Sequence, residues 1–224
     1  MNASTHLFAS RKMHEETTTK EKILKKVRKA LIEKTVKGLN VDFESDIFQK
    51  AEEPLEILFA TQFTKLNGKF IYCENENELC NNLSDLIAEN KWEGVFCYEK
   101  KAKEILRKAS VGFSENEKDI RHVNVGISFC ESLSARTGSV LVSSKQTAGR
   151  RLPAFANYHI VIAYSSQLVY TIKESLNEIK KKYGNNLPSM IVNIAGPSRT
   201  ADIEKTLVQG AHGPKEIYVF LVDA

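Results

Sequence analysis

A short run near the C-terminus combines a guanidinium, two hydroxyl groups and a glycine. The run GPSRTADIE follows the apolar stretch MIVNI, and its candidate ligand-binding residues are Gly196, Ser198, Arg199, Thr200, Asp202 and Glu204. A guanidinium binds a carboxylate or phosphate through two parallel hydrogen bonds. We expect a strand before this run and a helix from it to about Gln209, so the first amides of that helix would add a partial positive charge. The pattern indicates an anion site centred on Arg199.

The same run also has a purely structural interpretation. Thr200 can cap the expected helix, while Asp202 and Glu204 complement the positive end of its dipole. Arg199 then pairs with one of these acids, and the two nearby carboxylates weaken the capture of an anion. The residue types alone leave both interpretations open.

A second candidate, His212, lies between Gly210 and Gly213. Gly210 is typical of the residue that ends a helix. An imidazole next to a helix C-terminus gains proton affinity, which suits an acid-base role. The alternative is a histidine that only stabilises its turn through hydrogen bonds. His159, which opens the apolar run IVIA, allows the same two interpretations.

A third candidate loop follows a strand that we expect over residues 123–125. The candidate ligand-binding residues of this loop are Gly126, Glu131, Thr137, Gly138 and Ser139. A glycine permits close approach of the backbone, and the Thr-Gly-Ser turn offers hydroxyls and amides to an oxyanion. Equally, the two glycines can simply turn the chain while the hydroxyls cap it.

The elements that must position these loops alternate between short β-branched runs and helical patterns. We expect strands over 70–73, 95–98, 123–125, 139–143, 160–163, 190–194 and 217–222, with helices over 76–90, 100–109 and 166–183. This alternation is typical of βαβ units with a mainly parallel sheet. Crossover connections would place helices on both faces, which predicts a three-layer α/β domain. In such sheets ligands bind at the carboxyl ends of the strands.

The N-terminal part has a different composition. We expect a flexible arm over 1–16, a helical segment over 17–68 and the α/β domain over 69–224. Thr18 and Glu21 form a capping-box pattern before a helix that reaches Gly38, and Pro54 opens a second helix that stops at Gly68. Residues 1–40 hold ten Lys/Arg and four Asp/Glu. Without interleaved aromatics or a nucleic-acid-binding motif, this basicity favours a solvated amphipathic helix over a nucleic-acid partner.

Composition limits the class of protein. The chain has 224 residues, of which 42% are hydrophobic and 27% charged, as in ordinary soluble domains. We find neither a secretory signal nor a run of about 18 apolar residues that could span a membrane, so we expect a cytoplasmic protein. The oligomeric state stays open, a homo-oligomer included. Cys73, Cys80, Cys97 and Cys130 are spread singly, which predicts no metal site in this chain and places any iron-sulfur chemistry in another chain.

Three runs together resemble a known family. The runs GISFCESLSARTGSVLVSS, LPAFANYHIVIA and NIAGPSRTADIEKTLVQGAHGPKEIYVFLVD are similar to the LutC/YkgG family of LUD-domain lactate-utilisation proteins, strongly over residues 120–224 and in general layout before them. The matching motif residues are Gly126, Glu131, Thr137, Gly138, His159, Gly196, Pro197, Ser198, Arg199, Thr200, Asp202, Glu204, Gly210, His212 and Gly213. Arg136 departs from the family, many of whose members have an acid before the Thr-Gly turn.

The resemblance implies a fold like that of phosphosugar isomerases and CoA transferases (NagB/RpiA-like). It also implies a subunit of a bacterial complex that oxidises L-lactate to pyruvate, without a redox centre of its own. Iron-sulfur clusters would then lie in LutA-like and LutB-like partner subunits. In this interpretation Arg199 clamps a small carboxylate or phosphate, Ser198 or Thr200 orients it, and His212 exchanges or stabilises a proton. The alternatives are a self-sufficient enzyme acting on phosphorylated sugars or CoA esters, by fold analogy alone, and a purely structural interaction protein.

Overall fold

The computed structural model describes residues 18–32, 51–116, 120, 123–146, 151–201, 207–210 and 212–223. Contacts divide the chain into two units, Met1–Gln49 and Lys50–Ala224. The arm expected over 1–16 lies outside the described residues. None of the helices in the described ranges is long and apolar enough to cross a membrane.

The first unit contains the amphipathic helix α1 (Thr19–Ile32). The predicted capping box is confirmed, because the Glu21 amide donates to Thr18 Oγ1 at 3.3 Å and the Thr18 amide donates to Glu21 Oε2 at 3.0 Å. The rest of the helix expected up to Gly38 lies outside the described residues.

The second unit is built around a five-stranded sheet. Its strands are β1 (Lys69–Cys73), β2 (Val95–Cys97), β3 (Val125–Phe129), β6 (Tyr158–Tyr164) and β11 (Glu216–Val222). They run in the order β1-β11-β6-β3-β2, and every neighbouring pair is parallel. The mainly parallel α/β fold expected from the sequence is therefore confirmed.

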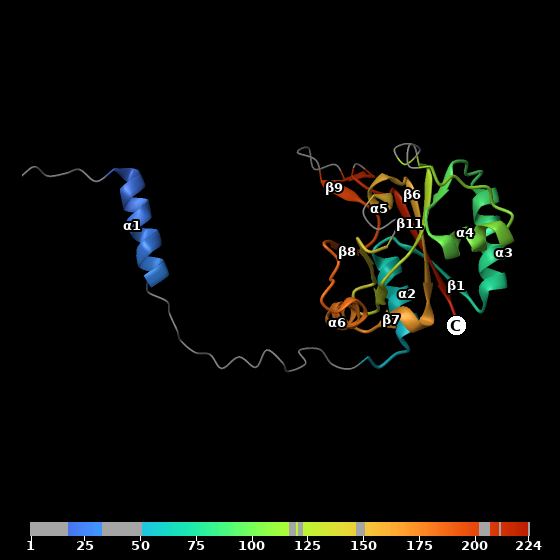
Figure 1. Ribbon diagram of the computed structural model, residues 1–224, viewed down its shortest axis with the longest axis horizontal. Helices are drawn as coiled ribbons and strands as arrows, with labels where there is room; N and C mark the ends of the chain where they lie inside the picture. Colours follow the sequence, from blue (N-terminus) through green and yellow to red (C-terminus); the bar gives the residue numbers. More distant parts are fainter. Residues whose placement is uncertain are drawn as a thin grey trace, which may run out of the picture. The chain divides into compact units, whose positions relative to one another are not determined.

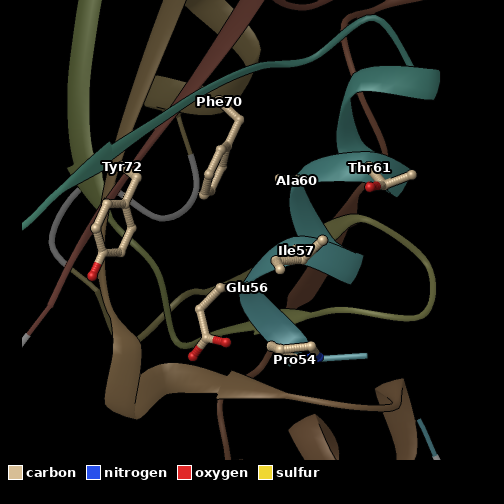
Figure 2. Close-up of a pocket in the computed structure, with 7 residues that line it drawn as sticks. All are labelled: Pro54, Glu56, Ile57, Ala60, Thr61, Phe70 and Tyr72. Atoms are coloured by element: carbon tan, nitrogen blue, oxygen red, sulfur yellow. The ribbon is translucent and has the colours of Figure 1, made fainter. Parts of the chain in front are cut away.

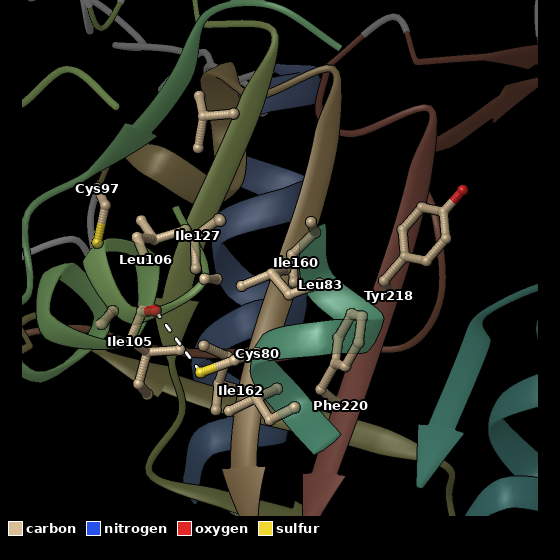
Figure 3. Packing of buried hydrophobic residues seen from close by; sticks show 14 of the residues in the cluster. Cys80, Leu83, Cys97, Ile105, Leu106, Ile127, Ile160, Ile162, Tyr218 and Phe220 are labelled. Atoms are coloured by element: carbon tan, nitrogen blue, oxygen red, sulfur yellow. Dashed lines mark hydrogen bonds between the residues drawn. The ribbon is translucent and has the colours of Figure 1, made fainter. Parts of the chain in front are cut away.

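Two helices cover one face of this sheet: α3 (Glu76–Glu89) and α4 (Lys100–Lys108). Leu83 of α3 and Leu106 of α4 are fully buried, and they belong to one core cluster with Ile160 and Phe220 of the sheet (Figure 3). Each such side chain contributes about 1.5–3 kcal/mol through burial. The Asn75 side chain begins α3 by accepting the amides of the second and third helical residues, which fixes where that helix starts.

The other face is covered by α2 (Leu55–Lys65) and by a second sheet. That sheet has the order β7-β4-β5-β8, formed by β4 (Ser132–Ser134), β5 (Ser139–Ser143), β7 (Leu168–Val169) and β8 (Ile191–Ile194). Phe59 and Phe63 of α2 are fully buried, with ring centroids 5.3 Å apart, and share a core cluster with Val161 and Val219. The three-layer arrangement is thus confirmed, but a helix and a sheet together form its third layer (Figure 1).

Some predicted boundaries were wrong. The helix expected over 166–183 begins only at Ile172 as α6 (Ile172–Tyr183), because Thr171 caps it and the preceding residues form a 3-10 turn and β7. The strand expected over 123–125 runs instead from Val125 to Phe129, since β2 and β6 pair with it on both sides. The short helix α5 (Leu152–Phe155) has only four residues and was not predicted.

Candidate functional site

The loops that contain Arg199 and His212 meet at Ser198. The Ser198 amide donates a hydrogen bond to Pro214 O at 2.8 Å, and Ser198 O accepts one from the Gly210 amide at 3.0 Å. A Cβ atom at Gly213 would lie 3.2 Å from Ser198 Cβ, so a residue without a side chain allows this close contact. Arg199 directly follows Ser198, and His212 directly precedes Gly213. The two candidate residues are therefore on neighbouring segments.

The prediction of a helix from this loop to Gln209 is wrong. Residues Arg199–Ala201 form β9 and Leu207–Gln209 form β10, and the two strands pair antiparallel with Thr200 opposite Val208. The backbone register of this hairpin takes the place of the expected helix. In the described residues of this loop no helix begins, so the amides of a helix start do not add to an anion site there. Asp202 and Glu204 lie outside the described residues.

Arg199 is exposed, and its guanidinium is held against the end of α2. Arg199 Nη2 donates to Leu66 O at 2.6 Å, and Leu66 is the residue that caps this helix. Carbonyls at a helix C-terminus carry partial negative charge, which attracts a cation. Because a guanidinium has five N–H donors, an arginine oriented in this way can still bind an anion through its other donors.

Two predicted glycines pack against the same end of α2. Gly196 has φ +85°, and a Cβ atom there would lie 2.4 Å from Leu66 O. Gly138 has φ +56°, and a Cβ atom there would lie 2.4 Å from Phe63 N. The last turns of α2 thus bring the Thr-Gly turn and the Arg199 loop to one place. We call the segments 137–139 and 196–199 at the end of α2, together with Gly210 and 212–214 that contact Ser198, the loop cluster.

The hydroxyls of the Thr-Gly turn are engaged with one another. Thr137 Oγ1 lies 2.6 Å from Ser139 Oγ and donates to Ser134 Oγ at 3.0 Å, and Ser139 is fully buried. Arg136 lies in the same turn. Gly126 is a residue of β3 rather than of a loop, and a Cβ atom there would lie 2.7 Å from Leu152 of α5.

The loop cluster lies at the amino edge of the parallel sheet, not at the carboxyl edge that the sequence led us to expect. Residues 212–214 precede the first residue of β11, and Lys215 donates its amide to Asn157 O just before β6 (Figure 1). Glu131 follows the last residue of β3 and so lies at the opposite edge. The structure therefore does not group Glu131 with Arg199.

Glu131 instead joins α6 to the second sheet. Its side chain is 1% exposed, and its carboxylate accepts hydrogen bonds from Lys182 and Tyr183 at 2.8 Å and from Ser143 at 2.6 Å. Burial raises the pKa of Glu131, but these three donors outweigh burial and hold the pKa below its usual range. Whether Glu131 also contacts a ligand stays a prediction.

His159 is fully buried beside Ser128, with its Nε2 2.9 Å from Ser128 Oγ. Burial lowers the pKa of His159 from 6.5 to about 4, so the imidazole is neutral at pH 7. This placement favours a structural role in pairing β3 with β6 over proton transfer with a ligand.

The depressed pKa of His159 predicts an acid-dependent loss of stability. The unfolded chain takes up the proton near pH 6.5 and the folded chain only near pH 4, so the stabilisation is complete above pH 6.5 and is lost as the pH falls toward 4. The loss should reach about 3 kcal/mol. Urea unfolding at several pH values should show this slope in the wild type and in the exposed-histidine control His212→Gln, but not in His159→Gln. Equal slopes in all three proteins would contradict the prediction.

Sequence reasoning missed Leu66. Its contribution is a backbone carbonyl at a helix end, which no side-chain motif reveals. The available signal was Gly68, which marks where α2 must stop and turn into β1.

Comparisons with known proteins show similarity in sequence and similarity in fold. Lactate utilization protein C of Bacillus subtilis (strain 168) is 37% identical over 112 residues, covering 49% of this chain and 47% of that protein. Lactate utilization protein C of Shouchella clausii (strain KSM-K16) is 34% identical over 125 residues, covering 53% and 55%. The chain thus matches about half the length of these curated relatives. A crystal structure of a DUF162 family protein from Deinococcus radiodurans has a TM-score of 0.52 at 15% identity, covering 75% of this chain and 96% of that one, which shows the shared fold.

The family itself is shown by a match that covers most of the second unit. The model of the LUD domain matches residues 57–222, from the first turns of α2 to the last residue of β11. This range includes α2, the parallel sheet, the second sheet and the loop cluster. The chain belongs to the LUD-domain family.

Proposed function

We propose that this chain acts in lactate utilisation, as a cytoplasmic subunit of an assembly that oxidises L-lactate to pyruvate. The observation that carries this proposal is the LUD-domain match over 57–222, together with relatives that bear the name Lactate utilization protein C. Oxidation of L-lactate to pyruvate releases two electrons and two protons. In this proposal the electrons pass to iron-sulfur clusters of LutA-like and LutB-like partner subunits, and this chain has no redox centre.

The part assigned to this chain is to hold the carboxylate. Arg199 is exposed and already oriented by Leu66 O, so its other donors can bind a carboxylate group without reorganising the loop. The Ser198 hydroxyl and the exposed imidazole of His212 belong to the adjoining segments. His212 then accepts one of the two released protons, and the other passes to solvent.

The proposed role is tested by affinity purification of the full chain from lactate-grown cells. We expect iron-sulfur proteins to copurify, and the purified assembly to reduce an artificial electron acceptor only when L-lactate is added. Recovery of the chain without iron-sulfur partners would contradict the role. Turnover of phosphorylated sugars or CoA esters by the chain alone would instead favour a self-sufficient enzyme.

A further inference from the structure

Strand β1 has one free edge. Within the described ranges it pairs with β11 on one side and with no strand on the other. The opposite edge of the sheet is different, because Cys97 of β2 donates its amide to Ser114 O at 3.1 Å and Ser114 donates to Val95 O at 2.8 Å. An exposed strand edge is a template for pairing with another strand.

A largely apolar groove lies beside this free edge, between β1 and the exposed face of α2 (Figure 2). Its volume is about 510 Å³, and it is lined by Pro54, Glu56, Ile57, Ala60, Thr61, Phe70 and Tyr72. Ile57 is 56% exposed and Tyr72 is 44% exposed, although both are large apolar side chains. Phe70 and Tyr72 project from the same face of β1 toward α2, as the alternation of a strand requires. Exposed apolar surface of this kind marks an interaction site.

The surface continues along α2. A second hollow is lined by Ala60, Thr61, Thr64 and Lys65, so it shares two residues with the groove. Glu56 therefore lies at one end of a continuous strip and Lys65 at the other. Neither residue has an ion-pair partner within the part of the chain that the structure describes.

We propose that this strip binds a second copy of the same chain, related by a two-fold axis that passes near Ile71 and between Ala60 and Thr61. About that axis β1 pairs antiparallel with β1 of the second copy. Phe70 of one copy then lies opposite Tyr72 of the other, and an aromatic ring of each copy fills the groove of its partner. The two parallel sheets then join into one, and the free edge disappears.

The residues on α2 are complementary about the same axis. Glu56 of one copy faces Lys65 of the other, and Ile57 faces Thr64. The small residues at the centre, Ala60 and Thr61, let two antiparallel helices approach closely. Such self-complementarity is what an interface with two-fold symmetry requires, and it selects a second copy over an unrelated partner. The strip shares no residue with the loop cluster, although Lys65 adjoins Leu66 at the end of α2, and the inference does not rest on the proposed function.

Sedimentation equilibrium of the full chain tests the proposal. The wild type is expected at twice the mass of a single chain. Ile57→Lys and Tyr72→Lys place exposed charges in the groove and should raise the dissociation constant at least tenfold. Lys173→Glu, an exposed substitution on α6, is the control and should leave the mass unchanged. Fluorescence of Trp92, the only tryptophan, which packs against Tyr158 and Tyr218, verifies that each variant is folded.

A charge exchange identifies the partner residue. Glu56→Lys and Lys65→Glu should each weaken the dimer, because each places like charges opposite one another, whereas the double variant should restore it. A wild type that stays at the mass of one chain would overturn the proposal, and the groove would then bind a different molecule. A dimer that is insensitive to Ile57→Lys and to the charge exchange would overturn it as well.

Discussion

Gly138→Ala is expected to lower the free energy of unfolding by about 3 kcal/mol or more. Gly138 has φ +56°, and its added Cβ atom would lie 2.4 Å from Phe63 N and 2.5 Å from Gln62 C. Both neighbours are backbone atoms of α2, which is fixed by the buried rings of Phe59 and Phe63. The substitution must therefore displace either the turn or the helix, in addition to the cost of a left-handed backbone.

A matched control separates these two effects. Gly94 also has a positive φ, +71°, but the atom nearest to an added Cβ, Asn124 Cβ, would lie 3.8 Å away, which is an ordinary contact. Gly94→Ala should therefore cost only the conformational part, about 1 kcal/mol. Urea unfolding followed by Trp92 fluorescence measures both losses. Equal losses in the two variants would show that contact with α2 does not constrain the Thr-Gly turn.

Arg199→Ala is expected to reduce lactate-dependent reduction of the acceptor by the purified assembly at least a hundredfold, or about 2.7 kcal/mol of transition-state stabilisation. Arg199→Lys keeps the charge but not the planar fork, and should also lose at least tenfold. Because the bond from Arg199 to Leu66 O is at the surface, the free energy of unfolding should fall by only about 1 kcal/mol. The variant chain should still copurify with its partners.

Arg28→Ala, on the exposed face of α1, is the control for loss of an arginine and should leave turnover unchanged. Full turnover by the Arg199→Ala assembly would reject the carboxylate clamp. Loss of turnover together with loss of the partners would assign Arg199 to assembly instead.

The parallel sheet could be predicted because its strands are short β-branched runs separated by helices of regular period. The second sheet could not be recognised as separate, because β4 is only three residues long and β7 only two. These strands form because β4 pairs with β5 on one side and with β7 on the other. The run after Gly196 contains residues that suit either a helix or a hairpin, and the pairing of β9 with β10 decides for the hairpin.

The candidate site was predictable in its residue types but not in its grouping. Placing the end of a strand at Val125 made Gly126 and Glu131 look like one loop. In the structure Gly126 lies inside β3, and the remaining residues of that strand separate it from Glu131. Sequence proximity could not show that Glu131 is at the carboxyl edge while Arg199 is at the amino edge. The closeness of Arg199 to Leu66 depends on how α2 packs, which no local pattern contains.

The central claim is that the loop cluster binds a carboxylate through Arg199. Calorimetric titration of L-lactate into the purified full chain tests this claim most directly, with wild type and Arg199→Ala compared under the same conditions. Saturable binding at one site per chain is expected in the wild type, with an affinity at least tenfold lower in the variant. Equal affinity in the two proteins, or no binding by the wild type, would contradict it.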